Sequence, residues 1–327
     1  MSKLLTSCRD LIRIDTLPNL VDTDPTQEPD KLHLDTLKEF IHILFDKNLK
    51  TLYENVHTTL PFLKPKKNTQ CMIMVLCGGK CGSTALFESF SKHGIDVIRI
   101  HNMDHFVEEY APFLKGVKGV EDVEIRKVLH PDDLLRFFLK FYRSIVVVDS
   151  YRDPLERKLS SFFQNFSFNL SRMGKTLSEW ESLTFKEQVD VFEKEMMPLL
   201  ERRHGLDTYY PTFFQNSFDF VTGMQQMAHP HQDFCRRVRL VKVRFSDIHQ
   251  WGSMFSKLFG WPLDKGFTIL PANESRTKEY AELYSQWKQH FQLKQEASLI
   301  DSVFDPVFFK YHSPEEMMAY YEKWRIR

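Results

Sequence analysis

Short apolar runs alternate with stretches of helical spacing through the middle of the chain. Continuous apolar runs at 71–77 (CMIMVLC), 95–100 (IDVIRI) and 144–151 (SIVVVDSY) predict strands that are covered on both faces of a sheet. Between and after them lie segments of helical spacing: ALFESFSKHG up to Gly94, DDLLRFFLKFY and DPLERKLSSFFQNF. The last segment has Pro154 near its first turn, where proline is tolerated. This alternation predicts an α/β fold with a central parallel sheet.

The two ends of the chain have different patterns. Apolar positions recur every three or four residues over 32–53, which predicts an amphipathic helix, and the Pro- and Lys-rich PFLKPKKNTQ after it is typical of a linker. Toward the C-terminus, RVRLVKVRF at 237–245 predicts a fourth strand, with a helix after it and a final helix in SPEEMMAYYEKW. We therefore expect an N-terminal helical arm and linker at 1–68, and an α/β domain with added helices at 69–327.

Composition narrows the class of protein. Of the 327 residues, 42% are hydrophobic and 27% charged, which is ordinary for a globular protein and excludes a disordered or collagen-like chain. The 44 basic and 44 acidic residues cancel, which argues against a nucleic-acid partner. Five cysteines, odd in number and irregularly spaced, favour reduced thiols over a disulfide framework. No apolar run approaches the roughly 20 residues that cross a bilayer, and the first residues lack a signal peptide's apolar run. We expect a soluble, cytoplasmic protein with no transmembrane segment; its oligomeric state stays open.

The strongest local motif follows the first predicted strand. It consists of two glycines, a lysine, a cysteine and a third glycine, then two hydroxyl residues that begin a helix: Gly78, Gly79, Lys80, Cys81, Gly82, Ser83 and Thr84. Glycines let backbone N–H groups approach an anion, and a helix N-terminus adds partial positive charge at the same place. The motif therefore predicts a phosphate-binding loop. The alternative is a glycine-rich turn with a Ser/Thr helix cap.

A second basic motif follows the third predicted strand. Arg152 lies at the strand's carboxyl end, and Ser160 comes eight residues later, two turns into the next helix. An arginine here can bind a phosphate bidentately, and ligands of parallel sheets bind at the carboxyl ends of the strands. Both motifs should therefore face one crevice and bind a ligand with two separate phosphate groups. The alternative is an ordinary ion pair of Arg with Asp or Glu at a helix start.

Together, the two motifs resemble those of sulfotransferases that use 3′-phosphoadenosine 5′-phosphosulfate (PAPS). The first family motif, Lys-x-Gly-Thr/Ser-Thr/x-x-Leu, matches Lys80 to Leu86, and the second, Arg-x-Pro-x-x-Arg-x-x-Ser, matches Arg152 to Ser160. The Glu156–Arg157 pair and Phe162 are most similar to the glycan-modifying branch, including heparan sulfate sulfotransferases. RLVKVRFSDI resembles the family's later strand and acidic turn, and the C-terminal SPEEMMAYYEKW resembles bacterial capsular polysaccharide synthesis proteins of the same fold.

The resemblance implies a three-layer, sulfotransferase-like P-loop fold that binds PAPS. It implies a 5′-phosphosulfate held by the loop residues Gly79, Lys80, Cys81, Gly82, Ser83 and Thr84, and a 3′-phosphate held by Arg152 and Ser160. The chain lacks the Arg-Lys-Gly motif that small-molecule sulfotransferases have near the C-terminus, and Arg276 and Lys278 are candidates for part of that role. The implied acceptor is a carbohydrate, a lipid-linked sugar or another small molecule.

Sulfuryl transfer requires a cation on the leaving phosphate oxygen and a base for the acceptor's proton. Lys80 is suited to the first task. Glu88, one turn after Thr84, is the first candidate base, because helical side chains lean toward the helix N-terminus and the resemblance implies a glutamate base. Its alternative is a surface pair with Lys92. His101 and His105 are the other candidate bases. No histidine pair has a third ligand nearby in sequence, so we expect no metal.

Two other function classes stay open. A P-loop kinase or related phosphotransferase needs Mg²⁺ and an acid on a neighbouring strand, for which Asp149 is the candidate. The loop order argues against it, because in nucleotide triphosphatases Lys-Ser/Thr follows the last glycine, whereas Lys80 precedes Gly82. The other class is a non-catalytic protein of the sulfotransferase fold that acts in polysaccharide assembly.

Overall fold

A computed structural model of the chain describes residues 69–101, 130–139, 142–199, 205–215, 218–260, 267–270, 280–291 and 306–324. The chain divides into two compact units, one made of Met1–Pro61 and Met103–Phe137 and the other of Phe62–Asn102 and Phe138–Arg327. Helix α7 (Pro131–Phe138) belongs almost wholly to the first unit, and the elements below belong to the second. The helix expected at 32–53 lies outside the described residues, and the expected boundary at 68 stays a prediction.

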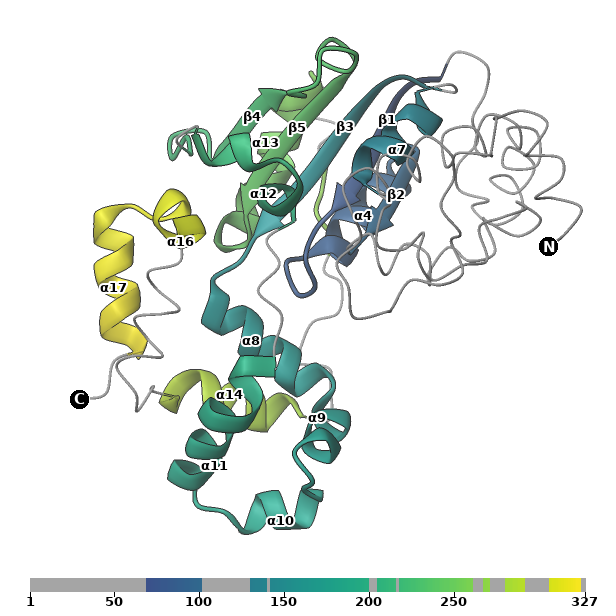
Figure 1. Cartoon of the computed structure of the whole chain (residues 1–327). Coiled ribbons are helices and arrows are strands. Elements are labelled where there is room, and N and C mark those ends of the chain that lie inside the picture. The colour runs from purple at the N-terminus through teal and green to yellow at the C-terminus, as the bar shows by residue number, and fades with distance from the viewer. Residues whose placement is uncertain are drawn as a thin grey trace, which may run out of the picture. The chain divides into compact units, whose positions relative to one another are not determined.

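The described part of the second unit contains five strands. A series of mostly short helices surrounds them along the chain (Figure 1). The strands are β1 (Thr69–Leu76), β2 (Val97–Ile100), β3 (Tyr142–Tyr151), β4 (Met224–Ala228) and β5 (Val238–Arg244). The helices are α4 (Ser83–Lys92), α8 (Pro154–Gln164), α9 (Phe166–Arg172), α10 (Leu177–Ser182), α11 (Phe185–Val191), η3 (Phe192–Met196), η4 (Met197–Leu199), α12 (Leu206–Tyr209), η5 (Pro211–Gln215), η6 (Phe245–Gln250), α13 (Trp251–Phe259), α14 (Ala281–His290), α16 (Pro306–Tyr311) and α17 (Pro314–Trp324).

The strands form one sheet in the order β2-β1-β3-β5-β4 (Figure 1). Every neighbouring pair is parallel except β4 and β5, which are antiparallel. The α/β class, the mostly parallel sheet and the four expected strands are therefore confirmed. The pattern missed β4, because its sequence MQQMA has neither an apolar run nor a clear alternation.

Helices α4 and α13 cover one face of the sheet. Val75, Val148 and Val243 project from β1, β3 and β5 into a core shared with both helices. The Phe90 ring of α4 meets the Phe255 ring of α13 edge-on, with 5.1 Å between centroids. Because this packing fixes the start of α4 over the sheet, it also fixes the loop between β1 and α4.

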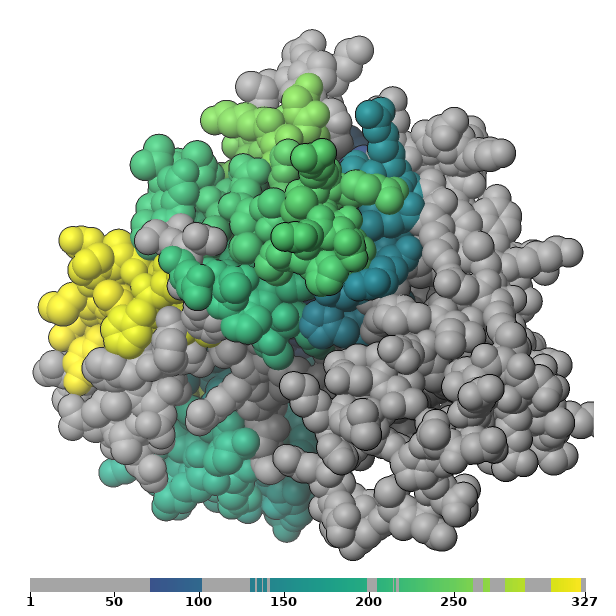
Figure 2. Space-filling view, turned by 45° about the horizontal axis from the view of Figure 1, so that its top comes forward, coloured from purple at the N-terminus to yellow at the C-terminus, as the bar shows by residue number. Residues whose placement is uncertain are grey.

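The helices outside the sheet form a second, largely aromatic core. Phe162 and Phe163 of α8, Trp180 of α10 and Trp287 of α14 are fully buried and in ring contact with one another. The C-terminal helices α16 and α17, yellow in Figure 2, lie against this core and against the end of β5. This packing holds α8, the helix that follows Arg152, in place.

Candidate functional site

The glycine-rich loop connects the carboxyl end of β1 to the first turn of α4. Gly82 is the N-terminal cap residue of α4 and has a φ of +85°. A Cβ added there would lie 3.0 Å from the rings of Phe245 and Trp251, so this position requires glycine for both conformation and space. Ser83 and Thr84 form the first turn, with Ser83 buried and Thr84 half-buried.

Lys80 has an uncommon backbone conformation. Its φ of +70° makes it the one non-glycine residue with positive φ in the described part of the chain. The left-handed region costs a side-chain-bearing residue about 1–2 kcal/mol, and such strain concentrates at functional sites. Its side chain is half-buried, beside an exposed Gly79.

The two loop cysteines are not poised as nucleophiles. Burial raises the pKa of the Cys81 thiol and raises that of Cys77 well above its usual range. Both thiols therefore stay protonated, and their contacts are with backbone carbonyls, of Val148 for Cys77 and of Gly79 for Cys81. Cys81 thus fills space under the loop.

The structure brings the second basic motif onto the first. β1 and β3 are parallel neighbours, so Arg152 leaves the sheet beside the loop. Its Nη1 donates to the carbonyl oxygen of Lys80 at 3.0 Å, and its guanidinium lies 4.5 Å from the centre of the Phe245 ring. Nη2 is 3.4 Å from the Tyr284 hydroxyl on α14. Arg152 therefore joins β3, the loop, α14 and the residue after β5.

The start of α8 is acidic. The Asp153 side chain caps the helix by accepting from the Glu156 N–H at 2.9 Å, and it also accepts from the Tyr320 hydroxyl of α17 at 2.8 Å. Burial and the nearby Glu156 charge raise the pKa of Asp153 to about 8. Burial also acts to raise the pKa of Glu156, but the hydrogen bond and charge of Lys323, 2.8 Å away, outweigh it and lower that pKa.

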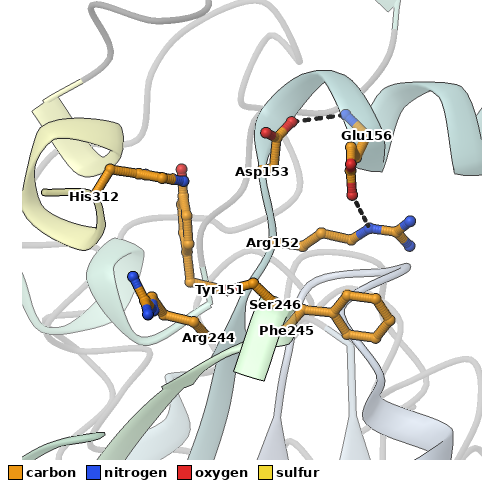
Figure 3. Close-up of a pocket in the computed structure, with 8 residues that line it drawn as sticks. All are labelled: Tyr151, Arg152, Asp153, Glu156, Arg244, Phe245, Ser246 and His312. Atoms are coloured by element: carbon orange, nitrogen blue, oxygen red, sulfur yellow. Dashed lines mark hydrogen bonds and ion pairs between the residues drawn. The ribbon is translucent and has the colours of Figure 1, made fainter. Parts of the chain in front are cut away.

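A small cavity of about 110 Å³ lies at this junction (Figure 3). It is lined by Tyr151, Arg152, Asp153, Glu156, Arg244, Phe245, Ser246 and His312. The Arg152 side chain is 10% exposed, and its Nε has no hydrogen-bond partner within the described residues, although a Glu156 carboxylate oxygen lies 3.9 Å away. A buried donor of this kind has unused capacity for an acceptor. Burial lowers the pKa of His312, whose ring faces Tyr151 and stays neutral near pH 7 (Figure 3).

The other residues predicted for the site make fewer contacts with the loop or lie outside the described part of the chain. Ser160 is half-buried two turns along α8, and its hydroxyl makes no hydrogen bond within the described part of the chain. Glu88 is exposed on α4. His101 directly follows β2, half-buried, with its Nδ1 3.4 Å from the carbonyl oxygen of Cys77 at the base of the loop. His105, Arg276 and Lys278 lie outside the described residues.

Asp149, the candidate Mg²⁺ ligand, is engaged elsewhere. It is fully buried, and its Oδ2 accepts from Lys242 Nζ at 2.6 Å and from the Leu206 N–H at 2.7 Å. Lys242 also contacts Asp207 Oδ2 at 2.6 Å, and Asp207 accepts from the Tyr311 hydroxyl at 2.9 Å. Asp149 therefore belongs to a buried ion network that connects β3, β5, α12 and α16.

Sequence reasoning missed Arg99. It projects from β2, and its Nη1 donates to the Thr84 hydroxyl at 3.0 Å. The arginine stands out in the sequence as the one polar residue of VIRI. Its place near the loop follows only from the sheet order, which puts β2 beside β1.

Among the described residues, no group of three or more His, Cys, Asp or Glu side chains is placed to hold a metal ion. None of the described helices has the length and apolar character needed to cross a membrane. Comparison of the chain with protein-family models, curated proteins and solved structures gives no match.

Proposed function

We propose that this chain is a PAPS-dependent sulfotransferase of the three-layer P-loop type, which moves a sulfuryl group to a hydroxyl or amine of a carbohydrate, lipid-linked sugar or small molecule. The observation that carries the proposal is the 3.0 Å hydrogen bond from Arg152 to the carbonyl oxygen of Lys80. It connects two motifs 72 residues apart that together resemble the family's two phosphate sites.

In this proposal the loop holds the phosphosulfate and the second motif holds the 3′-phosphate. The backbone from Gly79 to Gly82 and the first turn of α4 supply N–H donors and a partial positive charge. The Lys80 ammonium neutralises the leaving phosphate oxygen as the bond to sulfur breaks. Arg152, whose Nε makes no hydrogen bond among the described residues, donates to the second phosphate, and Ser160 adds a hydroxyl.

The acceptor's proton needs a base in reach of the same loop. Glu88 fits because it lies one turn beyond Thr84 on an exposed face of α4. His101 also fits: if its Nδ1 donates to the Cys77 carbonyl oxygen, the opposite ring nitrogen, Nε2, is left as an acceptor. Either base yields a sulfated acceptor and adenosine 3′,5′-bisphosphate.

The kinase alternative gains no support from the geometry. A Mg²⁺ site requires an acid free to face the nucleotide phosphates, whereas Asp149 is fully buried and paired with Lys242.

Calorimetric titration with adenosine 3′,5′-bisphosphate tests the proposal directly. We expect binding without added metal, weakened at least tenfold in Arg152→Ala, since a charged hydrogen bond contributes about 1.5–3 kcal/mol. Arg143→Ala, an exposed arginine near the other end of β3, is the matched control and should bind normally. Tight binding of ATP with Mg²⁺ in place of the bisphosphate would instead favour a kinase. Transfer of labelled sulfate from PAPS to an acceptor separates an enzyme from a non-catalytic binder.

A further inference from the structure

Two of the three guanidinium nitrogens of Arg152 are engaged by the protein. Nη1 donates to the carbonyl oxygen of Lys80 at 3.0 Å, and Nη2 is 3.4 Å from the Tyr284 hydroxyl. The third nitrogen, Nε, is buried and makes no hydrogen bond among the described residues, in a side chain that is 10% exposed and lines the small cavity. An oxygen atom of a ligand in that cavity would be the acceptor that this donor lacks.

The Glu156 carboxylate competes with a ligand for this donor. Glu156 lies four residues after Arg152, and its Oε2 is 3.9 Å from Arg152 Nε (Figure 3). A shift of about 1 Å would bring the two atoms to hydrogen-bond distance. The resulting pair would occupy Nε and cancel the charge that an anionic ligand needs. Asp153 competes less, because its pKa of about 8 keeps it largely protonated at pH 7.

Lys323 of α17 holds the same carboxylate. Its Nζ donates to Glu156 Oε1 at 2.8 Å, so the carboxylate is hydrogen-bonded to the lysine and only close to Arg152. Lys288 of α14 also acts on Glu156 through its charge, but its ammonium lies over the Tyr284 ring, 5.7 Å from the ring centre. Within the described ranges, Lys323 is therefore the cation that hydrogen-bonds Glu156.

Other residues of α17 keep this helix in place. The Tyr320 hydroxyl donates to Asp153 Oδ1 at 2.8 Å and accepts from the Leu155 N–H at 3.3 Å. Trp324 is fully buried in the aromatic core. The Lys323 side chain is 44% exposed, so its ion pair should contribute little to the stability of the fold. The pair matters instead for the charge that faces Arg152.

We propose that Lys323 is a positioning residue of the anion site: by hydrogen-bonding Glu156 it keeps that carboxylate from pairing with Arg152, and so leaves Arg152 to the second phosphate of the ligand. This inference rests on the proposed function, because it takes the anion at Arg152 to be that phosphate. It gives α17, which neither phosphate motif includes, a role in ligand affinity.

A double-mutant cycle on affinity for adenosine 3′,5′-bisphosphate tests this role. We expect Lys323→Met to weaken binding roughly tenfold, the scale of one lost charged hydrogen bond, because Glu156 then takes Arg152 Nε from the phosphate. Glu156→Gln removes the competing carboxylate and should bind at least as tightly as the wild type. Because Lys323 acts through Glu156, the double variant should bind within about threefold of Glu156→Gln alone.

Two control variants accompany the cycle. Lys323→Arg keeps a charged donor at this position and should bind within about threefold of the wild type. Lys257→Met removes the same charge from an exposed position on α13 and should bind normally.

The outcomes separate this inference from the proposed function. If Lys323→Met binds normally while Arg152→Ala loses binding, the role of Lys323 is overturned and the proposed function stands. If Lys323→Met weakens binding equally with and without Glu156→Gln, the lysine does not act through Glu156 and the inference is wrong. A wild type that does not bind the bisphosphate overturns both. Thermal unfolding midpoints of all variants identify any loss that comes from misfolding, and Lys323→Gln then repeats the cycle with a polar replacement.

Discussion

Replacing Lys242 by methionine should destabilise the protein strongly. The Lys242 side chain is 0% exposed, and its Nζ lies 2.6 Å from both Asp149 Oδ2 and Asp207 Oδ2. Methionine is close in length and fills the same space, so the change removes the charge with little effect on packing. It leaves two buried carboxylates, and the Lys310 Nζ at 3.4 Å from Asp207 Oδ1 neutralises only one of them.

The size of the loss follows from the cost of an unpaired buried charge. Removing one partner of a buried ion pair typically costs about 3–5 kcal/mol. Burial already raises the pKa of Asp149 despite the adjacent lysine, and without the lysine that pKa should rise further. Asp149 should then bind a proton on folding, so the loss should shrink as the pH is lowered from 7 toward 5.

Urea denaturation followed by tryptophan fluorescence measures this effect. Lys257→Met is the matched control, because Lys257 is exposed on α13 and its replacement should change stability by less than about 0.5 kcal/mol. Adding Asp149→Asn to Lys242→Met should recover part of the loss, since it removes the unpaired carboxylate. A Lys242→Met loss below about 1 kcal/mol at pH 7, or a loss that does not change with pH, would refute the assignment of a buried ion network.

Three further predictions concern the site itself. Asp153→Asn should flatten the pH dependence of stability. The pKa of Asp153 is about 8 in the folded state and about 4 in the unfolded state, so the wild type loses up to about 1.4 kcal/mol of stability per pH unit between pH 4 and 8. In denaturation at a series of pH values, the variant should be more stable than the wild type at pH 8 and equally stable near pH 4. The Lys80→Gly variant should be about 1 kcal/mol more stable than Lys80→Ala, because glycine adopts the positive φ without strain. Both variants should lose sulfate transfer. Equal unfolding free energies of the two variants would show that the loop relaxes when the lysine is replaced. Glu88→Gln should lower turnover roughly 10²–10⁴-fold with nearly unchanged affinity for the bisphosphate, as expected when a general base is lost. If Glu88→Gln keeps near-normal turnover and His101→Asn loses it, His101 is the base.

Much of the sheet could be predicted because it is encoded locally. The runs around β1 and β3 are largely apolar on both faces, as a covered parallel sheet requires, and Pro154 marks the start of α8. The helices α10 and α11 are also encoded locally, through capping boxes at Thr176 and Thr184. The edge strand β4 was missed because an edge position tolerates polar side chains such as Gln226, which faces solvent.

The site could be predicted only as two separate motifs, because the contacts that join them are distant in sequence. Arg152 meets Lys80 across 72 residues and Tyr284 across 132. Phe245, which packs on both Gly82 and Arg152, belongs to the segment after β5. Such contacts depend on the order of strands in the sheet, which apolar periodicity does not specify. Asp149 shows the reverse case: an acid at a strand end that looks like a metal ligand in sequence pairs with Lys242, its register partner on β5.

The two helix starts at the carboxyl edge of the sheet differ in charge, and this difference decides how each can bind an anion. The first turn of α4 has no acidic residue, so its N–H groups and partial positive charge remain available to a ligand. At α8, Asp153, whose raised pKa keeps it largely protonated at pH 7, accepts from the Glu156 N–H, and the Glu156 charge in the first turn offsets the helix dipole. A phosphate near α8 must therefore be bound by side chains. Arg152 is placed for this because it lies between the two helix starts: its Nη1 donates to the Lys80 carbonyl oxygen, and its Nε lies 3.9 Å from a Glu156 carboxylate oxygen. The 3′-phosphate affinity should thus depend on Arg152 far more than on the α8 backbone, and raising the ionic strength should weaken it accordingly.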